Sequence, residues 1–133
     1  GSAHAGWGGA FRGVLEATVT AMEALGAHRE NIVVVIGPCI AQESYEVGPE
    51  FLERFVDIDA QNERFFVPSD RENHFRFDLP GYGLSRLKGA GIYQCSWTRQ
   101  DTCAQAEAFF SYRRSVLQGE PDYGRQISGI RLA

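Results

Sequence analysis

NIVVVI at residues 31–36, which runs directly into GPCI at residues 37–40, is the strongest structural signal in this chain. The apolar run is β-branched and too short for a helix between these flanks, so it predicts a strand. Its continuous apolar character predicts that the strand is buried on both faces. The Gly-Pro pair ends the strand, and a turn at that position is a common place for a binding loop.

Helix and strand patterns alternate along the rest of the chain. The expected helices cover residues 10–25, a segment opening at Gly48-Pro49, and a segment from an N-cap at Asp78 to about Lys88. The expected strands cover residues 65–67, 74–77, 91–98 and 126–132. Because the pieces at 65–67 and 74–77 resemble a hairpin, the pattern predicts an α+β fold rather than a doubly wound parallel sheet.

The composition limits the classes of protein to consider. The 133 residues are 44% hydrophobic, enough to bury a core, and form one domain or part of a larger one. A net charge of −4 argues against nucleic-acid or anionic-membrane partners. No apolar run reaches membrane-span length and no signal peptide is visible. Three cysteines without a C-x-x-C pair predict reduced thiols in a cytoplasmic protein.

HAGWGG at residues 4–9 is the first candidate site. Its glycines let the backbone bend sharply, so His4 could act as a metal ligand or a general base, and Trp7 could form a wall for an aromatic ring. A solvated terminal histidine is the alternative. Residues 1–3 are interpreted as residues left from recombinant expression or as the remaining end of a strand. The three histidines and three cysteines show no local zinc-binding spacing.

Further candidate residues lie later in the chain. Cys39 could contact a substrate or a metal, or could simply fill the end of a strand. Arg113 and Arg114 follow an aromatic pair and could hold a phosphate or carboxylate, or could be surface ion-pair partners. If this segment is extended, at most one of the two faces a given pocket. Glu46 and Asp101 are weaker candidates for proton transfer, because neither has a second acid at an informative spacing.

Seven short motifs carry a family resemblance. They are, in chain order, HAGWGG, GVLEATV, IGPCI, YEVGPEF, FDL, FFSYRR and YGR. This series resembles the C-terminal half of the multicopper polyphenol oxidase or laccase-domain family, whose members are also described as purine nucleoside phosphorylases with adenosine deaminase activity. The resemblance runs over residues 4–133 and covers about half of a typical member.

The resemblance implies a four-layer α/β/β/α sandwich, incomplete in this chain, and a metal site of two histidines and one cysteine. The metal is usually zinc and sometimes copper. His4 matches one ligand, which makes it the expected metal-binding and catalytic residue. The other two ligands belong to motifs that precede His4 in the family, and Cys39 lies at a different position from the ligand cysteine.

One departure from the family pattern concerns position 8. The family usually has arginine or lysine after His-Ala-Gly-Trp, whereas this chain has Gly8. Glycine supplies no cation, so phosphate holding would fall to Arg113, Arg114 or Arg125. Trp7 would stack on the base, and Cys39 would contact the substrate.

Three functions remain open from the sequence. The first is a portion of a metal-dependent purine nucleoside phosphorylase or adenosine deaminase, inactive by itself, that acts on a purine nucleoside and phosphate. The second is a non-catalytic binding or assembly module on the same scaffold. The third is a copper-dependent polyphenol oxidase. The incomplete sandwich also predicts association, through exposed apolar surface, with a missing N-terminal half or with another copy of the chain.

Overall fold

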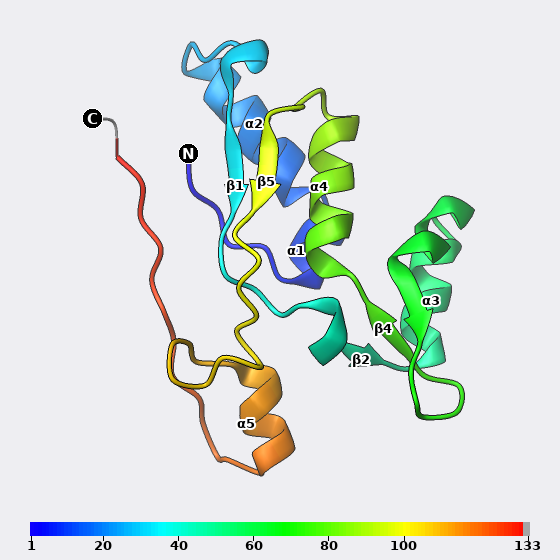
Figure 1. Cartoon of the computed structure of the whole chain (residues 1–133). Coiled ribbons are helices and arrows are strands. Elements are labelled where there is room, and N and C mark those ends of the chain that lie inside the picture. Colours follow the sequence, from blue (N-terminus) through cyan, green and yellow to red (C-terminus); the bar gives the residue numbers. More distant parts are fainter. Residues whose placement is uncertain (132–133) are drawn as a thin grey trace. The chain divides into compact units, whose positions relative to one another are not determined.

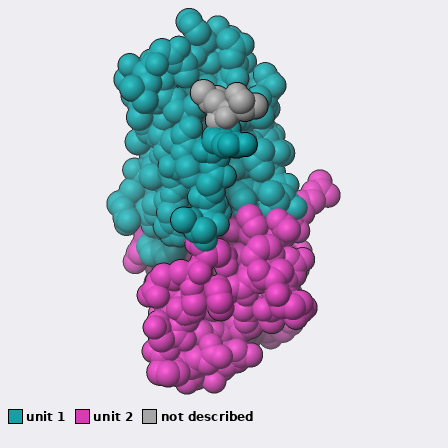
Figure 2. Space-filling view, turned by 90° about the vertical axis from the view of Figure 1, so that its left-hand side faces the viewer, with its two compact units in different colours: residues 1–37, 83–98, 127–133 teal, residues 38–82, 99–126 magenta. Residues whose placement is uncertain are grey.

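The computed structural model describes residues 1–131, which form two compact units (Figure 2). Unit 1 comprises residues 1–37, 83–98 and the chain from residue 127 onward, and unit 2 comprises residues 38–82 and 99–126. The helices are α1 (Trp7–Phe11), α2 (Val14–Ala24), α3 (Pro49–Val56), α4 (Leu79–Gly89) and α5 (Tyr112–Gln118), and the strands are β1 (Val34–Ile36), β2 (Glu46–Val47), β3 (Phe66–Pro68), β4 (Phe75–Phe77) and β5 (Cys95–Trp97) (Figure 1). Short 3-10 turns cover Arg29–Asn31, Gln42–Ser44 and Ala60–Phe65.

Unit 1 is built on the parallel pair of β1 and β5, in which Val34 pairs with Cys95. Helices α2 and α4 contribute the side chains that cover one face of this pair (Figure 1). The buried centre of this core consists of Val19, Ile32, Leu87 and Ile92, with Val34, Ile36 and Cys95 packed against it from the strands. Side chains alternate along a strand, so this face takes every second residue of β1.

The prediction of a strand at residues 31–36 is confirmed in a shorter form, but the prediction that both of its faces are buried is wrong. Val33 is 64% exposed and Val35 is 59% exposed. Val35 pairs with Ser96, which is also exposed. The described part of unit 1 places its helices against the other face, so the apolar run is covered on one side only.

The single helix expected over residues 10–25 is instead two helices. Gly13 separates α1 from α2 and adopts a left-handed conformation with φ of 89°. Only glycine takes this conformation without a steric penalty. Arg86 stabilises the break, because it donates to the Phe11 carbonyl at 3.4 Å and forms an ion pair with Glu16.

Unit 2 is built on an aromatic core. Its sheet has the order β2-β4-β3 and is antiparallel throughout, which confirms the expected hairpin of the segments 65–67 and 74–77. Phe55 and Phe77 are both 0% exposed, with ring centroids 4.8 Å apart. The expected helix at Pro49 is confirmed as α3. The N-cap at Asp78 is also confirmed, because its Oδ1 accepts from the Gly81 N–H at 2.9 Å.

The last part of the chain departs from the sequence prediction. Residues 126–131 of the expected strand have no regular secondary structure, and residue 132 lies outside the described residues. Ile127 is 97% exposed, and a strand needs a neighbour to satisfy its backbone groups. The segment around Arg113 is the helix α5 rather than extended chain, because the Ser111 hydroxyl caps it by accepting from the Arg114 N–H at 3.3 Å.

Within residues 1–131, no helix combines the length and the apolar character that crossing a bilayer requires.

The turn after α4 yields a stability prediction. Gly91 has a φ of 81°, and a Cβ at this position would lie 3.2 Å from Arg29 Cδ. We expect Gly91→Ala to lower the free energy of unfolding by about 1–2 kcal/mol, because the left-handed conformation is strained with a side chain. Gly89 has an ordinary φ and open space around it, so Gly89→Ala is expected to raise stability by about 0.4–1 kcal/mol. Urea midpoints of the two variants measure this, and shifts of the same sign would contradict the assignment.

Candidate functional site

The His4 segment lies in unit 1, directly before α1. The backbone at Gly6 is extended and caps the helix that begins at Trp7. The His4 side chain is exposed, and its Nε2 lies 3.9 Å from where a Cβ on Gly6 would be. The Trp7 ring is half-buried and packs against Phe11, with ring centroids 6.4 Å apart. The turn therefore carries an exposed imidazole at position 4 and a half-buried indole at position 7.

The guanidinium of Arg12 lies beside Gly8, and the sequence analysis did not identify it. A Cβ at Gly8 would lie only 3.1 Å from Arg12 Nη1, so the Arg12 guanidinium occupies the space where a side chain at position 8 would begin. The two residues are four positions apart, the spacing at which helical side chains are neighbours. That spacing is the signal that could have identified Arg12.

The described residues do not by themselves fit a metal site. Within residues 1–131, no group of three His, Cys, Asp or Glu side chains is placed to hold a metal ion. A protein site for zinc normally requires at least three such ligands. His4 belongs to unit 1 and Cys39 to unit 2, and all three cysteines are thiols rather than disulfide-bonded.

Cys39 and Asp101 are paired in unit 2 by a parallel β-bridge. The Cys39 N–H donates to the Gln100 carbonyl at 3.2 Å, and the Cys39 carbonyl accepts from the Thr102 N–H at 3.0 Å. The Asp101 carboxylate accepts from the Ser44 hydroxyl at 2.6 Å and from the Cys103 N–H at 2.8 Å. This carboxylate therefore holds the loop together, and the half-buried Cys39 lies on the same bridge.

Arg114 shapes the loop that precedes α5. Its Nη1 donates to the carbonyls of Thr102 and Cys103 at 2.8 and 2.9 Å, and its Nη2 donates to the Phe109 carbonyl. Arg114 also lines a cavity of about 600 Å³ together with Phe110 and Tyr123. Three backbone carbonyls thus take up most of the donor capacity of this guanidinium.

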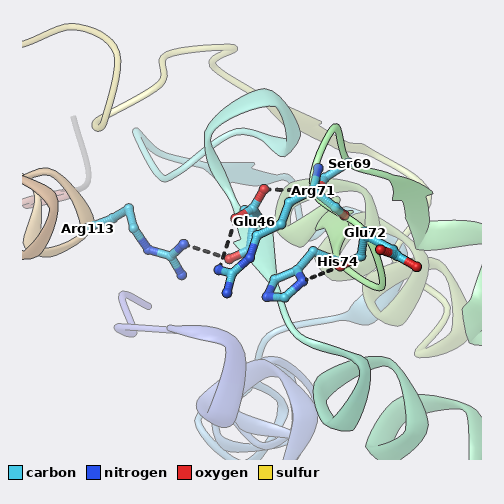
Figure 3. Close-up of polar contacts among 6 residues, drawn as sticks. All are labelled: Glu46, Ser69, Arg71, Glu72, His74 and Arg113. Atoms are coloured by element: carbon cyan, nitrogen blue, oxygen red, sulfur yellow. Dashed lines mark hydrogen bonds and ion pairs between the residues drawn. The ribbon is translucent and has the colours of Figure 1, made fainter.

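Arg113 is not among the residues that line that cavity, and its side chain extends toward Glu46 of β2 (Figure 3). Its Nη1 donates to the Glu46 carbonyl at 2.6 Å, and its guanidinium carbon lies 5.1 Å from the centroid of the Tyr45 ring. The two arginines therefore face different surroundings, as the sequence predicts. The reason is different, because consecutive residues of a helix diverge by about 100° rather than alternating across a strand.

Glu46 of β2 and three side chains of the β3–β4 loop, Ser69, Arg71 and His74, lie in this region (Figure 3). The Glu46 carboxylate accepts from the Ser69 hydroxyl at 2.9 Å and lies 3.9 Å from Arg71 Nη1. His74 Nδ1 lies 2.9 Å from the Glu72 carbonyl, and its ring is half-buried. Of these side chains, only Glu46 was a candidate from the sequence, because the pairing of β2 with β4, which places Arg76 opposite Glu46, has no local signature.

Tyr45 gives this region a pH dependence. Burial raises the pKa of the Tyr45 phenol, and the positive charge of Arg113 offsets part of that rise. A raised pKa in the folded state means that stability is fully present below the ordinary tyrosine value of about 10 and is lost as pH rises above it. We expect Tyr45→Phe to lose less stability than the parent between about pH 9 and 11.5, measured by urea unfolding at each pH. An identical alkaline loss in both proteins would contradict this account.

The helices, the parallel strand pair and the antiparallel sheet together form a mixed α+β protein. The family model described as multi-copper polyphenol oxidoreductase laccase matches residues 1–133. The chain therefore belongs to that family.

The curated relatives carry names from nucleoside metabolism. The chain is 40% identical over 130 residues to a protein of Rickettsia conorii named purine nucleoside phosphorylase, which covers 98% of the chain and 53% of that protein. It is 30% identical over 129 residues to a protein of an unknown prokaryotic organism named adenosine deaminase, covering 96% of the chain and 48% of that protein. The chain spans about half the length of these relatives.

Solved structures support the same fold. The chain resembles the hypothetical protein YfiH of Bacillus licheniformis with a TM-score of 0.75 at 27% identity, over 86% of this chain and 44% of that one. It resembles the Neisseria meningitidis protein NMB0706 with a TM-score of 0.70 at 28% identity, over 84% and 45% of the two chains. The mixed α+β fold expected from the sequence is thus shown.

Proposed function

We propose that the protein represented by this chain processes purine nucleosides and that phosphorolysis is its principal reaction. The observation that carries this proposal is the 40% identity, over 98% of the chain, to a protein named purine nucleoside phosphorylase. In phosphorolysis a phosphate oxygen forms a bond to the ribose C1′, the bond from C1′ to the base breaks, and the base leaves with a proton. Such an enzyme must hold an anion and a flat base at the same time.

The proposed roles follow from the described geometry. Trp7 supplies an aromatic wall for a base beside the exposed imidazole of His4. Arg113 is better suited than Arg114 to hold an anion, because Arg114 already donates to three carbonyls whereas one such bond is recorded for Arg113. Arg114 shapes the cavity wall, and Cys39 is proposed to contact the substrate from its bridge position.

The metal belongs to the proposal as well. His4 is proposed as one ligand of a zinc ion, with copper as the alternative, and the remaining donors would come from sequence that this chain does not contain. This assignment rests on the family resemblance, because the described residues hold no three-donor group. A bound ion of this kind supplies Lewis-acid chemistry.

The partner proposed for the chain is the part of the relatives that it does not match, with a second copy of the chain as the alternative. The chain covers 53% of the Rickettsia conorii relative. The exposed Val33 and Val35 on the uncovered face of β1 are suited to such a contact, because parallel strands usually have both faces covered.

Product analysis tests the reaction class. The test protein is a fusion of this chain to the part of the Rickettsia conorii relative that it does not match, here called the completed protein. We expect it to release hypoxanthine from inosine only when phosphate is present and to form ribose 1-phosphate in equal amount. Ammonia release from adenosine without phosphate would favour deamination, the activity named for another relative. Copper-dependent oxidation of a phenol, without nucleoside turnover, would favour the oxidase that the family description names.

A further inference from the structure

We propose that Arg71, His74 and Arg113 form a binding site for inorganic phosphate on unit 2. Arg113 and Arg71 both contact Glu46, and His74 lies on the same β3–β4 loop as Arg71, with its backbone N–H donating to the Arg71 carbonyl at 3.1 Å (Figure 3). The identity of the anion rests on the proposed function, whereas the existence of the site rests on the geometry of these residues alone.

Arg113 is held in place but retains donors for a ligand. One nitrogen donates to the Glu46 carbonyl at 2.6 Å, and the guanidinium packs over the Tyr45 ring at 5.1 Å. Within the described chain no acceptor is recorded for its other N–H groups. A guanidinium fixed through one nitrogen can offer its remaining N–H groups to an anion without losing much side-chain freedom.

His74 is held in one tautomer. Its Nδ1 lies 2.9 Å from the Glu72 carbonyl, which can only accept a hydrogen bond. The proton of a neutral ring must therefore be on Nδ1, and Nε2 is available as an acceptor. Nε2 can then accept from a monoprotonated phosphate, or donate to a phosphate oxygen when the ring is protonated. No partner of Nε2 is recorded within residues 1–131.

Arg71 supplies an exposed second cation. Its guanidinium is 68% exposed, and its nearest recorded anion is Glu46 Oε1 at 3.9 Å. An exposed pair at this separation is weak, so a phosphate can compete for Arg71 at little cost. The Ser69 hydroxyl donates to the other oxygen of Glu46 at 2.9 Å and keeps that carboxylate oriented.

The charge balance of the cluster favours an anion. Two guanidinium groups oppose one carboxylate, so the cluster carries a net positive charge even when His74 is neutral. The neighbouring acids do not cancel it: Asp70 pairs with Arg76 at 2.7 Å, and the Glu72 carboxylate extends away from Arg113 (Figure 3). The Glu46 carboxylate repels an anion. Neutralising it is therefore expected to strengthen phosphate binding, whereas neutralising an arginine is expected to weaken it.

Titration of the 133-residue chain with inorganic phosphate, followed by calorimetry and amide NMR shifts, tests the site directly. We expect Arg113→Gln and Arg71→Gln each to weaken phosphate binding at least fivefold and His74→Ala at least threefold, while Glu46→Gln strengthens it. Arg54→Gln is the matched control, because it removes an exposed cation of the same unit, on α3 and outside the cluster, and should leave binding within twofold. Arg71 is exposed, so its variant is expected to fold normally.

Two results would overturn the site: no phosphate binding by the parent chain, or equal weakening in Arg71→Gln and Arg54→Gln. Neither result depends on turnover, so the site and the proposed function fail separately. The phosphate affinities of the variants could follow the expected order while the completed protein fails to cleave inosine. That result would contradict the proposed phosphorolysis and would still support the phosphate site.

Discussion

Replacement of Phe77 by alanine is expected to lower the free energy of unfolding by about 3–5 kcal/mol, the usual cost of removing a fully buried phenylalanine ring. Phe77 is 0% exposed, and its ring centroid lies 4.7 Å from that of Phe66 and 4.8 Å from that of Phe55. Its loss leaves a cavity at the centre of the sheet of unit 2. Small domains are stable by only about 5–15 kcal/mol, so the variant loses a large fraction of its stability.

Phe110→Ala is the matched control, because that ring is 56% exposed and its removal should cost less than about 1 kcal/mol. Urea unfolding followed by circular dichroism measures both variants. Similar midpoints for the two would show that the aromatic core does not hold unit 2 together.

His4→Ala in the completed protein is expected to lower kcat/KM for inosine by more than about a hundredfold. The reason is the role proposed for His4 as a metal ligand, since replacing even a hydrogen-bond partner of a ligand commonly costs 10- to 100-fold. Stability should change by no more than about 0.5 kcal/mol, because the side chain is exposed. Steady-state assays with inosine and phosphate measure the effect.

His28→Ala provides the comparison for that experiment, because His28 is an exposed histidine of the same unit outside the His4 turn. It should retain full activity. Full activity in His4→Ala would contradict the assignment of His4 to the site. Equal losses of kcat/KM in His4→Ala and His28→Ala would indicate a general effect on folding.

The elements that could be predicted are those whose signals are local. The hairpin at residues 65–77 and the helix after Asp78 follow from side-chain alternation and an N-cap, and both are present. The helix over residues 10–25 was predicted without its break, because the sequence does not show that Gly13 is held in a left-handed conformation beside Arg86.

Burial and side-chain neighbours proved less predictable. An apolar run indicates a strand, but whether both faces are covered depends on which elements lie against it, as the exposed Val35 shows. The approach of Arg71 to Glu46 depends on the pairing of β2 with β4, which are separated in the sequence by a helix, a 3-10 turn and β3. Arg113 was identified as an anion-holding candidate because an aromatic pair followed by two arginines is a compositional signal, although its helical conformation was missed.

Nucleoside turnover by the 133-residue chain alone, compared with the completed protein at equal concentration, tests the central claim most directly. The claim is that purine chemistry on this scaffold needs donors that the described residues do not provide. The prediction is phosphate-dependent release of hypoxanthine by the completed protein and only background release by the chain alone. Equal rates from both would contradict the account.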